Sequence, residues 1–108
     1  MNVNEYQQKA MRTLNKELSG KEILVNAALG LCGEAGEVAD IVKKHIFHDH
    51  ELDRDSLIKE LGDVAWYIAE AATALGASLE EVLSKNIEKL QKRYPDGFDY
   101  QKSINRED

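Results

Sequence analysis

The near absence of proline constrains this chain more than any other feature. A single proline, Pro95, lies near the C-terminal end of the 108 residues. Because proline breaks helices, the sequence before it can form long, uninterrupted elements. Strand-like alternation is scarce there, and we find no linker, low-complexity tract or internal repeat. The chain is therefore expected to fold as one all-α domain.

Hydrophobic periodicity and boundary residues predict four helices. They cover residues 3–18, residues 21–47, a segment from Asp53 or Asp55 to Gly76, and residues 78–94. Either aspartate can cap the third helix, and Gly76 can end it. The fourth helix starts with a capping box of Ser78 and Glu81, and it ends before the proline.

Three of the predicted helices have one apolar face, which indicates a shared core. Successive residues lie about 100° apart on a helix, and this spacing defines one stripe on each of the three. The stripes are Leu24, Ala28, Leu31, Ala35, Val38 and Val42; Leu57, Leu61, Val64, Ile68, Ala72 and Leu75; and Leu79, Val82, Leu83, Ile87 and Leu90. We expect a small four-helix bundle in which the second and third helices form a hairpin.

The composition excludes some classes of function. Hydrophobic residues make up 43% of the chain and charged residues 31%, as in soluble folded domains. A formal net charge of −6 argues against nonspecific binding to nucleic acid, which depends on neutralising phosphates. No apolar run approaches the ~20 residues of a membrane span, and the start MNVNEYQQKA lacks the features of a signal peptide. With one cysteine, Cys32, these features favour a cytoplasmic protein.

Two acidic pairs at helical spacing are the strongest indication of chemistry. Glu34 and Glu37 are three residues apart, as are Glu60 and Asp63, and residues at this spacing share a helix face. Each pair borders its apolar stripe, so an antiparallel hairpin can bring the four carboxylates together. Such a cluster repels itself unless a hard cation fills it, and oxygen ligands suit Mg²⁺, Mn²⁺ or Ca²⁺.

Two other interpretations of these acids remain. They can be ordinary solvated pairs on the acidic surface of a non-catalytic helical protein with an interaction or regulatory role. They can also belong to a di-iron carboxylate bundle, although such bundles use Glu-x-x-His pairs. Here Glu37 and Asp63 stand in place of the histidines, which makes the di-iron interpretation poor.

Four blocks of sequence together carry a family resemblance. They are EYQQKAMRT, ALGLCGEAGEVAD, KELGDVAWYIA and NIEKLQKRYPDGF, and with the residues between them they span residues 5–98. In this order they resemble the MazG-like nucleotide pyrophosphohydrolases of the all-α NTP pyrophosphatase superfamily. The resemblance implies a domain over residues 1–98 with a polar tail over residues 99–108. It also implies an oligomer, either a homodimer or a homotetramer.

The resemblance further implies an activity and a set of ligands. The activity is Mg²⁺-dependent hydrolysis of nucleoside triphosphates, standard or modified (d)NTPs, to monophosphate and pyrophosphate, with Mn²⁺ as a substitute. The implied metal ligands are Glu34, Glu37, Glu60 and Asp63. We also predict that Glu37 orients or deprotonates the attacking water. Many members carry a further glutamate where this chain has Gly33, which puts a fifth acid near a second metal in doubt.

Polar side chains of the fourth helix are predicted to hold the phosphate chain. Cations recur there at a spacing of four residues, and the resemblance favours contacts from Asn86, Lys89 and Arg93. The alternative is a solvated face paired with Glu81 and Glu88. Lys44, at the end of the second helix, is a further candidate, although lysines are common at helix C-termini.

Tyr67 and Trp66 are adjacent but have different predicted roles. Tyr67 follows Asp63 by four residues, so its ring is expected beside the metal, in contact with the sugar or base. The alternative is a half-buried tyrosine at the edge of the core. Trp66 projects away from the apolar stripe among small residues, which predicts an interface with another chain. The alternative for Trp66 is packing under the first helix.

Glycines, histidines and the cysteine complete the set of candidate residues. Gly30, Gly33 and Gly36 lie beside the first acidic pair, although each costs a helix about 1 kcal/mol. We expect their missing side chains to let another helix or a triphosphate approach the backbone. The segment HIFHDH indicates a mobile loop near the substrate in preference to a zinc site. Cys32 is predicted to be a small core or interface residue.

Overall fold

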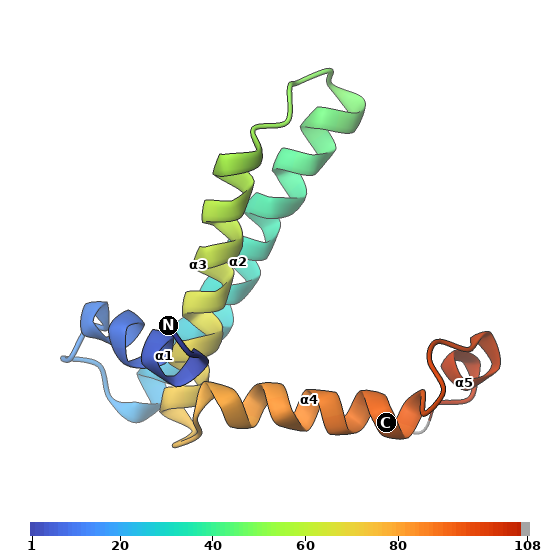
Figure 1. Ribbon diagram of the computed structural model, residues 1–108. Coiled ribbons are helices and arrows are strands. Elements are labelled where there is room, and N and C mark those ends of the chain that lie inside the picture. Colours follow the sequence, from blue (N-terminus) through green and yellow to red (C-terminus); the bar gives the residue numbers. More distant parts are fainter. Residues whose placement is uncertain (107–108) are drawn as a thin grey trace.

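In the described part of the chain, residues 1–106, the regular elements are all helices and there is no strand. The computed structural model has the following elements: α1 Val3–Ala10, the 3₁₀ helix η1 Met11–Thr13, α2 Gly20–Phe47, α3 Arg54–Ala74, α4 Leu79–Arg93 and α5 Tyr100–Ile104 (Figure 1). The all-α class is thereby confirmed. No helix within residues 1–106 is both long enough and apolar enough to cross a membrane.

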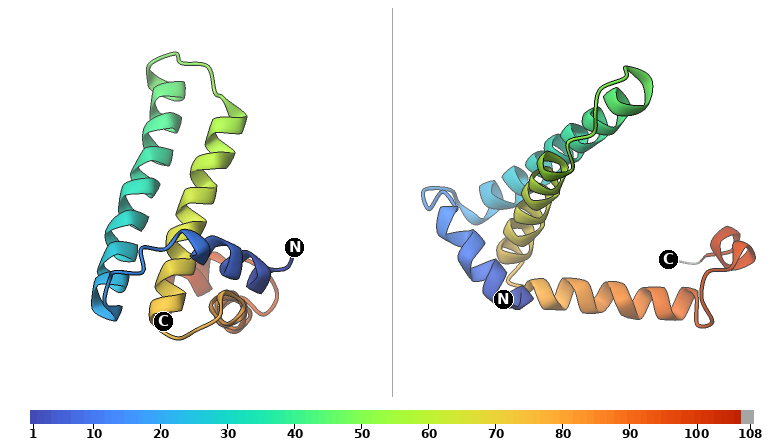
Figure 2. Two further views of the ribbon diagram at one scale, coloured as in Figure 1. Left: turned by 90° about the vertical axis from the view of Figure 1, so that its left-hand side faces the viewer. Right: turned by 45° about the horizontal axis from the view of Figure 1, so that its top comes forward.

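The centre of the molecule is a hairpin of α2 and α3, which run antiparallel and side by side (Figures 1 and 2). Ser19 caps α2 in a capping box with Glu22, which the sequence analysis did not identify. Of the two candidate caps for α3, Asp53 is the one used, since its side chain accepts a hydrogen bond from the Ser56 amide. The first turns of both helices therefore have partners for their backbone amides.

The first helix is shorter than predicted. It ends at Ala10, η1 follows, and Leu14 is extended, so the prediction of a helix over residues 3–18 is wrong. The cause lies in α3. The Ala10 carbonyl accepts hydrogen bonds from the Trp66 indole and the Thr13 hydroxyl, whereas the Leu14 amide bonds to Met11 instead of continuing an α-helix.

A glutamine of α1 holds the turn between α3 and α4. The Gln7 side chain accepts from the Leu79 amide at 2.7 Å and donates to the Thr73 hydroxyl at 3.0 Å and the Ala77 carbonyl at 3.1 Å. Gly76, with φ +69°, supplies the left-handed residue that ends α3. These contacts fix the direction in which α4 leaves the hairpin.

The predicted four-helix bundle does not form within one chain, which is a correction to the expected fold. α4 contacts α1 and α3 and extends away from the hairpin, with α5 beyond its far end (Figure 1). Of its apolar stripe, Leu79 is buried, but Leu83, Ile87 and Leu90 are exposed. The radius of gyration is 16.8 Å, whereas a compact domain of this length has about 13 Å.

The buried apolar side chains are few and mostly small, and of these Ala27 lies in the contact between α2 and α3, the seam of the hairpin. The buried apolar side chains among residues 1–106 are Ala10, Ala27, Ala69, Ala72 and Leu79. On α2 the seam is offset from the predicted stripe, because Leu24, Ala28 and Ala35 are exposed, whereas Gly30 and Glu34 are partly covered. The first acid of the ExxE motif therefore lies on the seam, and much of the predicted apolar stripe faces outward.

Candidate metal centre

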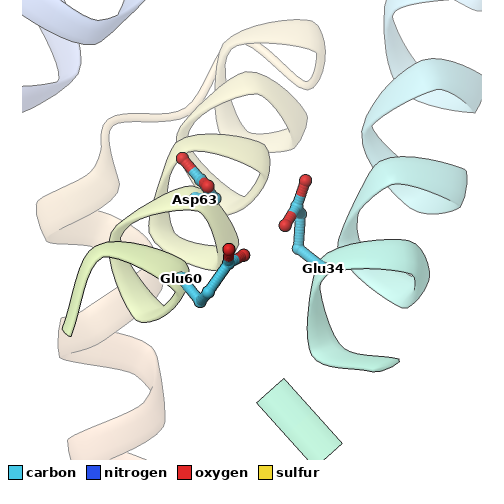
Figure 3. Close-up of side chains that lie close together, drawn as sticks. All are labelled: Glu34, Glu60 and Asp63. Carbon is cyan, nitrogen blue, oxygen red and sulfur yellow. The ribbon is translucent and has the colours of Figure 1, made fainter. Parts of the chain in front are cut away.

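Three carboxylates meet across the hairpin. Glu34 of α2 faces Glu60 and Asp63 of α3 (Figure 3), and one oxygen of each lies within 4.8 Å of the others. Glu60 and Asp63 share a face of α3 because they are three residues apart, and Glu34 meets them because it lies on the seam. Glu34 and Glu60 are half-buried and Asp63 is exposed, so the cluster opens to solvent on one side.

The electrostatics of this cluster match a cation site. The pKa of Glu34 is raised, first by its hydrogen bond with Glu60, then by desolvation, and then by the charges of Asp63, Glu60 and Glu37. Negative neighbours favour the protonated form of a carboxyl group. A divalent cation removes this repulsion, and carboxylate oxygens are the ligands that Mg²⁺ and Mn²⁺ prefer.

Glu37 lies near this group but does not belong to it. Its charge contributes to the raised pKa of Glu34, yet its oxygens are not among those within 4.8 Å of one another. The side chain is exposed. Its roles as fourth ligand and as the residue that activates water therefore stay predictions.

A hollow of about 350 Å³ opens beside the carboxylates. It is lined by Thr13, Glu34, Asp63, Trp66 and Tyr67. The two aromatic rings meet edge to face, with centroids 5.1 Å apart. The structure thus brings Tyr67 next to the acids, as predicted from its spacing, and leaves it half-buried.

The three glycines of α2 have different environments. A Cβ added at Gly30 would overlap the Tyr67 ring, so this position requires glycine for close approach. At Gly33 and Gly36, an added Cβ would meet no atom within 4 Å. The expectation that another helix or a triphosphate approaches these two glycines stays a prediction.

The sequence analysis did not identify two residues that lie beside the carboxylates. The pKa of Tyr6 is raised by burial and by the charge of Asp63, so α1 lies close to the carboxylate cluster. Thr13 lines the hollow and accepts a hydrogen bond from the Trp66 indole at 3.0 Å. Both lie within the EYQQKAMRT block, but on a continuous helix over residues 3–18 their positions could not be derived.

The predicted phosphate-binding residues of α4 lie away from the acids of the same chain. Lys89 and Arg93 border a second hollow, of about 370 Å³, between α4 and α5. The other residues that line it are Lys92, Asp99, Gln101, Lys102, Asn105 and Arg106. Asn86 is exposed on the same helix. This hollow, the basic hollow, belongs to the arm that leaves the hairpin (Figure 1).

Lys44 has a partner on its own helix. Its ammonium group lies 2.8 Å from an Asp40 oxygen, and Asp40, followed by the charge of Glu37, raises the pKa of Lys44. An exposed ion pair at i,i+4 explains its position without a substrate. Its role in substrate binding stays a prediction.

Trp66 contacts the first helix and η1 of its own chain. Its indole donates to the Ala10 carbonyl at 2.9 Å and to the Thr13 hydroxyl at 3.0 Å. The alternative, packing against the first helix, is the one observed. Trp66 lies opposite the predicted stripe, on a face of α3 that η1 contacts, and a role for its half-buried ring between two chains stays a prediction.

The histidines and the cysteine show no catalytic arrangement. The His45 ring nitrogen Nδ1 lies 2.8 Å from the His50 carbonyl oxygen. Within residues 1–106, no histidine or cysteine joins a group able to hold a metal. Cys32 is exposed, which contradicts a core position and leaves the predicted interface position open. Of the predicted polar tail, residues 107–108 lie outside the described residues.

Comparisons with known proteins found a family match and similar proteins in a phage and a bacterium. Residues 25–98 match the family described as the MazG nucleotide pyrophosphohydrolase domain. The chain is 46% identical over 77 residues to the Gene 37 protein of Mycobacterium phage L5, and the match covers 67% of each. It is 40% identical over 73 residues to the uncharacterized protein YvdC of Bacillus subtilis, covering 59% of this chain and 69% of YvdC. No solved structure matches.

Proposed function

This chain belongs to the MazG nucleotide pyrophosphohydrolase family, and from that premise we propose that it hydrolyses nucleoside triphosphates to monophosphate and pyrophosphate with Mg²⁺. The observation that carries the proposal is the convergence of Glu34, Glu60 and Asp63 to within 4.8 Å across the hairpin. A triphosphate is strongly anionic, so an acidic site binds it only with a cation between the two.

The residues of the cluster fit such a cation. Glu34, Glu60 and Asp63 would hold it, and Glu37, one turn from Glu34, is the proposed fourth ligand. A bound Mg²⁺ supplies positive charge to the phosphate oxygens and lowers the pKa of a coordinated water. We propose that Glu37 orients that water, because its exposed carboxylate is not committed to the three-carboxylate group.

The hollow beside the cluster is the proposed place for the nucleoside. Its wall combines the Tyr67 ring with the Thr13 hydroxyl, next to Asp63. Gly30 supports this arrangement, because the absence of a side chain there lets Tyr67 rest against α2. An aromatic face with an adjacent hydroxyl suits a sugar or base, and the carboxylates beside it suit the metal-bound phosphates.

The cations for the phosphate chain are proposed to come from a second copy of the chain. In one chain, α4 carries Lys89 and Arg93 away from the acidic cluster (Figure 1). The large exposed side chains of α4, Leu83, Ile87 and Leu90, support an assembly that covers them. A homodimer or homotetramer would bury this face and bring the basic hollow of one copy to the acids of another.

Product analysis tests the proposed reaction. Standard and modified (d)NTPs are incubated with the full chain and Mg²⁺, and monophosphate is resolved from diphosphate. We expect monophosphate with pyrophosphate, loss of turnover on chelation, and loss of turnover in Glu34→Gln. The matched control is Glu51→Gln, which changes an exposed glutamate in the α2–α3 loop and should be active.

Two results would count against the proposal. Release of orthophosphate with diphosphate would reassign the reaction. An absence of both turnover and Mn²⁺ binding would favour the alternative, a non-catalytic helical interaction protein with an acidic surface.

A further inference from the structure

The proposed reaction does not use the most deeply buried acid among residues 1–106. Glu70 of α3 has no exposed surface, and it is the largest fully buried side chain within residues 1–106. The Asn26 amide of α2 donates to both of its carboxylate oxygens, each at 3.0 Å. An acid is seldom fully buried unless it has a partner, so the pair at this position requires a physical reason.

The pair lies on the same seam between α2 and α3 as the three-carboxylate cluster. Along α2, Asn26, Gly30 and Glu34 follow one another at four-residue spacing. The residues that oppose them on α3 are Glu70, Tyr67 and then Asp63 with Glu60. The Asn26–Glu70 bond is therefore two helical turns from the carboxylates, and the contact of Tyr67 with Gly30 lies between them.

The seam has one other feature that resists a slide, the fit of the Tyr67 ring against Gly30. Around that contact its residues are small, with Ala27 on α2 and, at helical spacing from Tyr67 and Glu70, Ala71 and Ala74 on α3. A slide of one turn, about 5.4 Å, would move the ring from Gly30 to a residue that has a side chain. The same slide would separate Asn26 from Glu70 and leave a buried carboxylate without its donor, which is strongly unfavourable. It would also carry Glu34 away from Glu60.

We propose that Asn26 and Glu70 form a positioning pair, which sets the register of α2 on α3 and so brings Glu34 against Glu60 and Asp63. Buried polar pairs are best attested in this role, where they select one register among apolar alternatives. The proposal rests on the proposed function in one respect, since metal affinity is one of its two measures.

The decisive variant replaces both members with an apolar residue, Asn26→Leu with Glu70→Leu. Replacement of buried polar groups by apolar residues is often neutral or stabilising, and this applies to Glu70, which is buried, whereas Asn26 is exposed. We therefore expect an unfolding midpoint equal to or above that of the wild type, together with Mn²⁺ affinity that falls about tenfold or more. Glu70→Gln is the matched control, because it keeps an acceptor for Asn26 and should bind Mn²⁺ as the wild type does.

The register can also be measured without metal. The Tyr67 ring lies against Gly30, so ring currents shift the Gly30 resonances in an NMR spectrum. We expect the shift in the wild type and in Glu70→Gln, and its loss or splitting in the double variant. If the double variant does not fold, Glu70→Leu alone replaces it, since Asn26 is exposed enough to be hydrated.

The outcomes separate the two proposals. A folded apolar variant that keeps both the Gly30 shift and the Mn²⁺ affinity overturns the positioning role. Equal losses of stability and affinity in that variant also overturn it, because a general loss of folding explains them. If the wild type binds no Mn²⁺, the proposed function fails, and the Gly30 shift alone decides the register.

Discussion

The hairpin and the arm of this molecule place different charged groups around their hollows and differ in how firmly they are held. In the hairpin of α2 and α3, acids from two helices converge, and a hydrogen bond to a buried carboxylate and a ring packed on a glycine lie along the same seam. The arm of α4 and α5 has cations around its hollow and apolar side chains exposed to solvent. Within one chain the hairpin already brings its acids together. The exposed apolar side chains of the arm are typical of a surface that another chain covers.

The largest expected effect comes from two variants, one that loses an acid of the hairpin and one that loses cations of the arm, tested alone and then mixed. Glu60→Gln removes a metal ligand from the hairpin, and Lys89→Ala with Arg93→Ala removes cations from the arm. Because metal and cation stabilisation of phosphate charge is worth several kcal/mol, each variant alone should lose about 100-fold or more in kcat/KM. Co-refolded in equal amounts, the two should recover about a quarter of wild-type activity, since half of the dimers are mixed and each has one intact site.

The division of the site between two chains is contradicted if mixed oligomers form but recover no activity. The cations would then act on the acids of their own chain, which requires α4 to move. Lys85→Ala is the control, because this exposed lysine pairs with Glu81 on the same helix and does not line the basic hollow. It should be active alone.

The glycines of α2 give the next largest effect. Gly30→Ala places a methyl group where the Tyr67 ring lies, and overpacking of this kind costs about 1–3 kcal/mol. Gly33→Ala meets open space, so it should stabilise the helix by about 0.5–1 kcal/mol. Urea unfolding measures both. A loss of activity in Gly33→Ala without a loss of stability would support the approach of a helix or triphosphate to this face.

Local signals in the sequence predicted the helices better than their arrangement. The end of α2, the start of α3 at one of two candidate caps, and the start of α4 at Ser78 depend on residues within one turn, so they could be predicted. The end of α1 could not, because it depends on the Trp66 indole of α3 bonding to Ala10. Such a contact leaves no periodic signal in either segment.

The candidate site divides in the same way. The spacing of Glu60 and Asp63 on α3 predicted their shared face, and the position of Tyr67 followed from it. The direction of α4 did not follow, because it depends on Gln7 bonding across the α3–α4 turn. For that reason Lys89 and Arg93 were expected beside acids that, within one chain, they do not reach.

The junction between hairpin and arm should respond to loss of this clamp. Gln7→Ala removes the acceptor for the Leu79 amide and the donor to Thr73 and Ala77. Partly buried groups left without partners cost about 1–3 kcal/mol, so we expect a lower urea midpoint. Gln8→Ala, at an exposed neighbouring position, should have no effect. Equal effects of the two variants would mean that α1 stabilises the turn by packing and not through Gln7.

The smallest expected difference concerns the two helix caps. Asp53 in the hairpin and Ser78 in the arm each accept a hydrogen bond from the amide three residues on. Only the carboxylate titrates, and its bonds to the Ser56 amide and hydroxyl lower the pKa of Asp53. A lowered pKa adds stability above the pKa of the unfolded chain, and this stability is lost as the pH falls through the folded pKa.

Asp53→Asn should therefore remove part of the acid dependence while it keeps the cap, because asparagine caps helices about as well as aspartate. The measurement is the unfolding midpoint from neutral to acidic pH in the two proteins. Ser78→Asn should shift the midpoint by the same amount at every pH, because neither residue titrates there. If the unfolding midpoint of Asp53→Asn falls with acid as that of the wild type does, the Ser56 contacts hold the start of α3 whether or not Asp53 is protonated. Acid should then weaken the hairpin and the arm to the same extent.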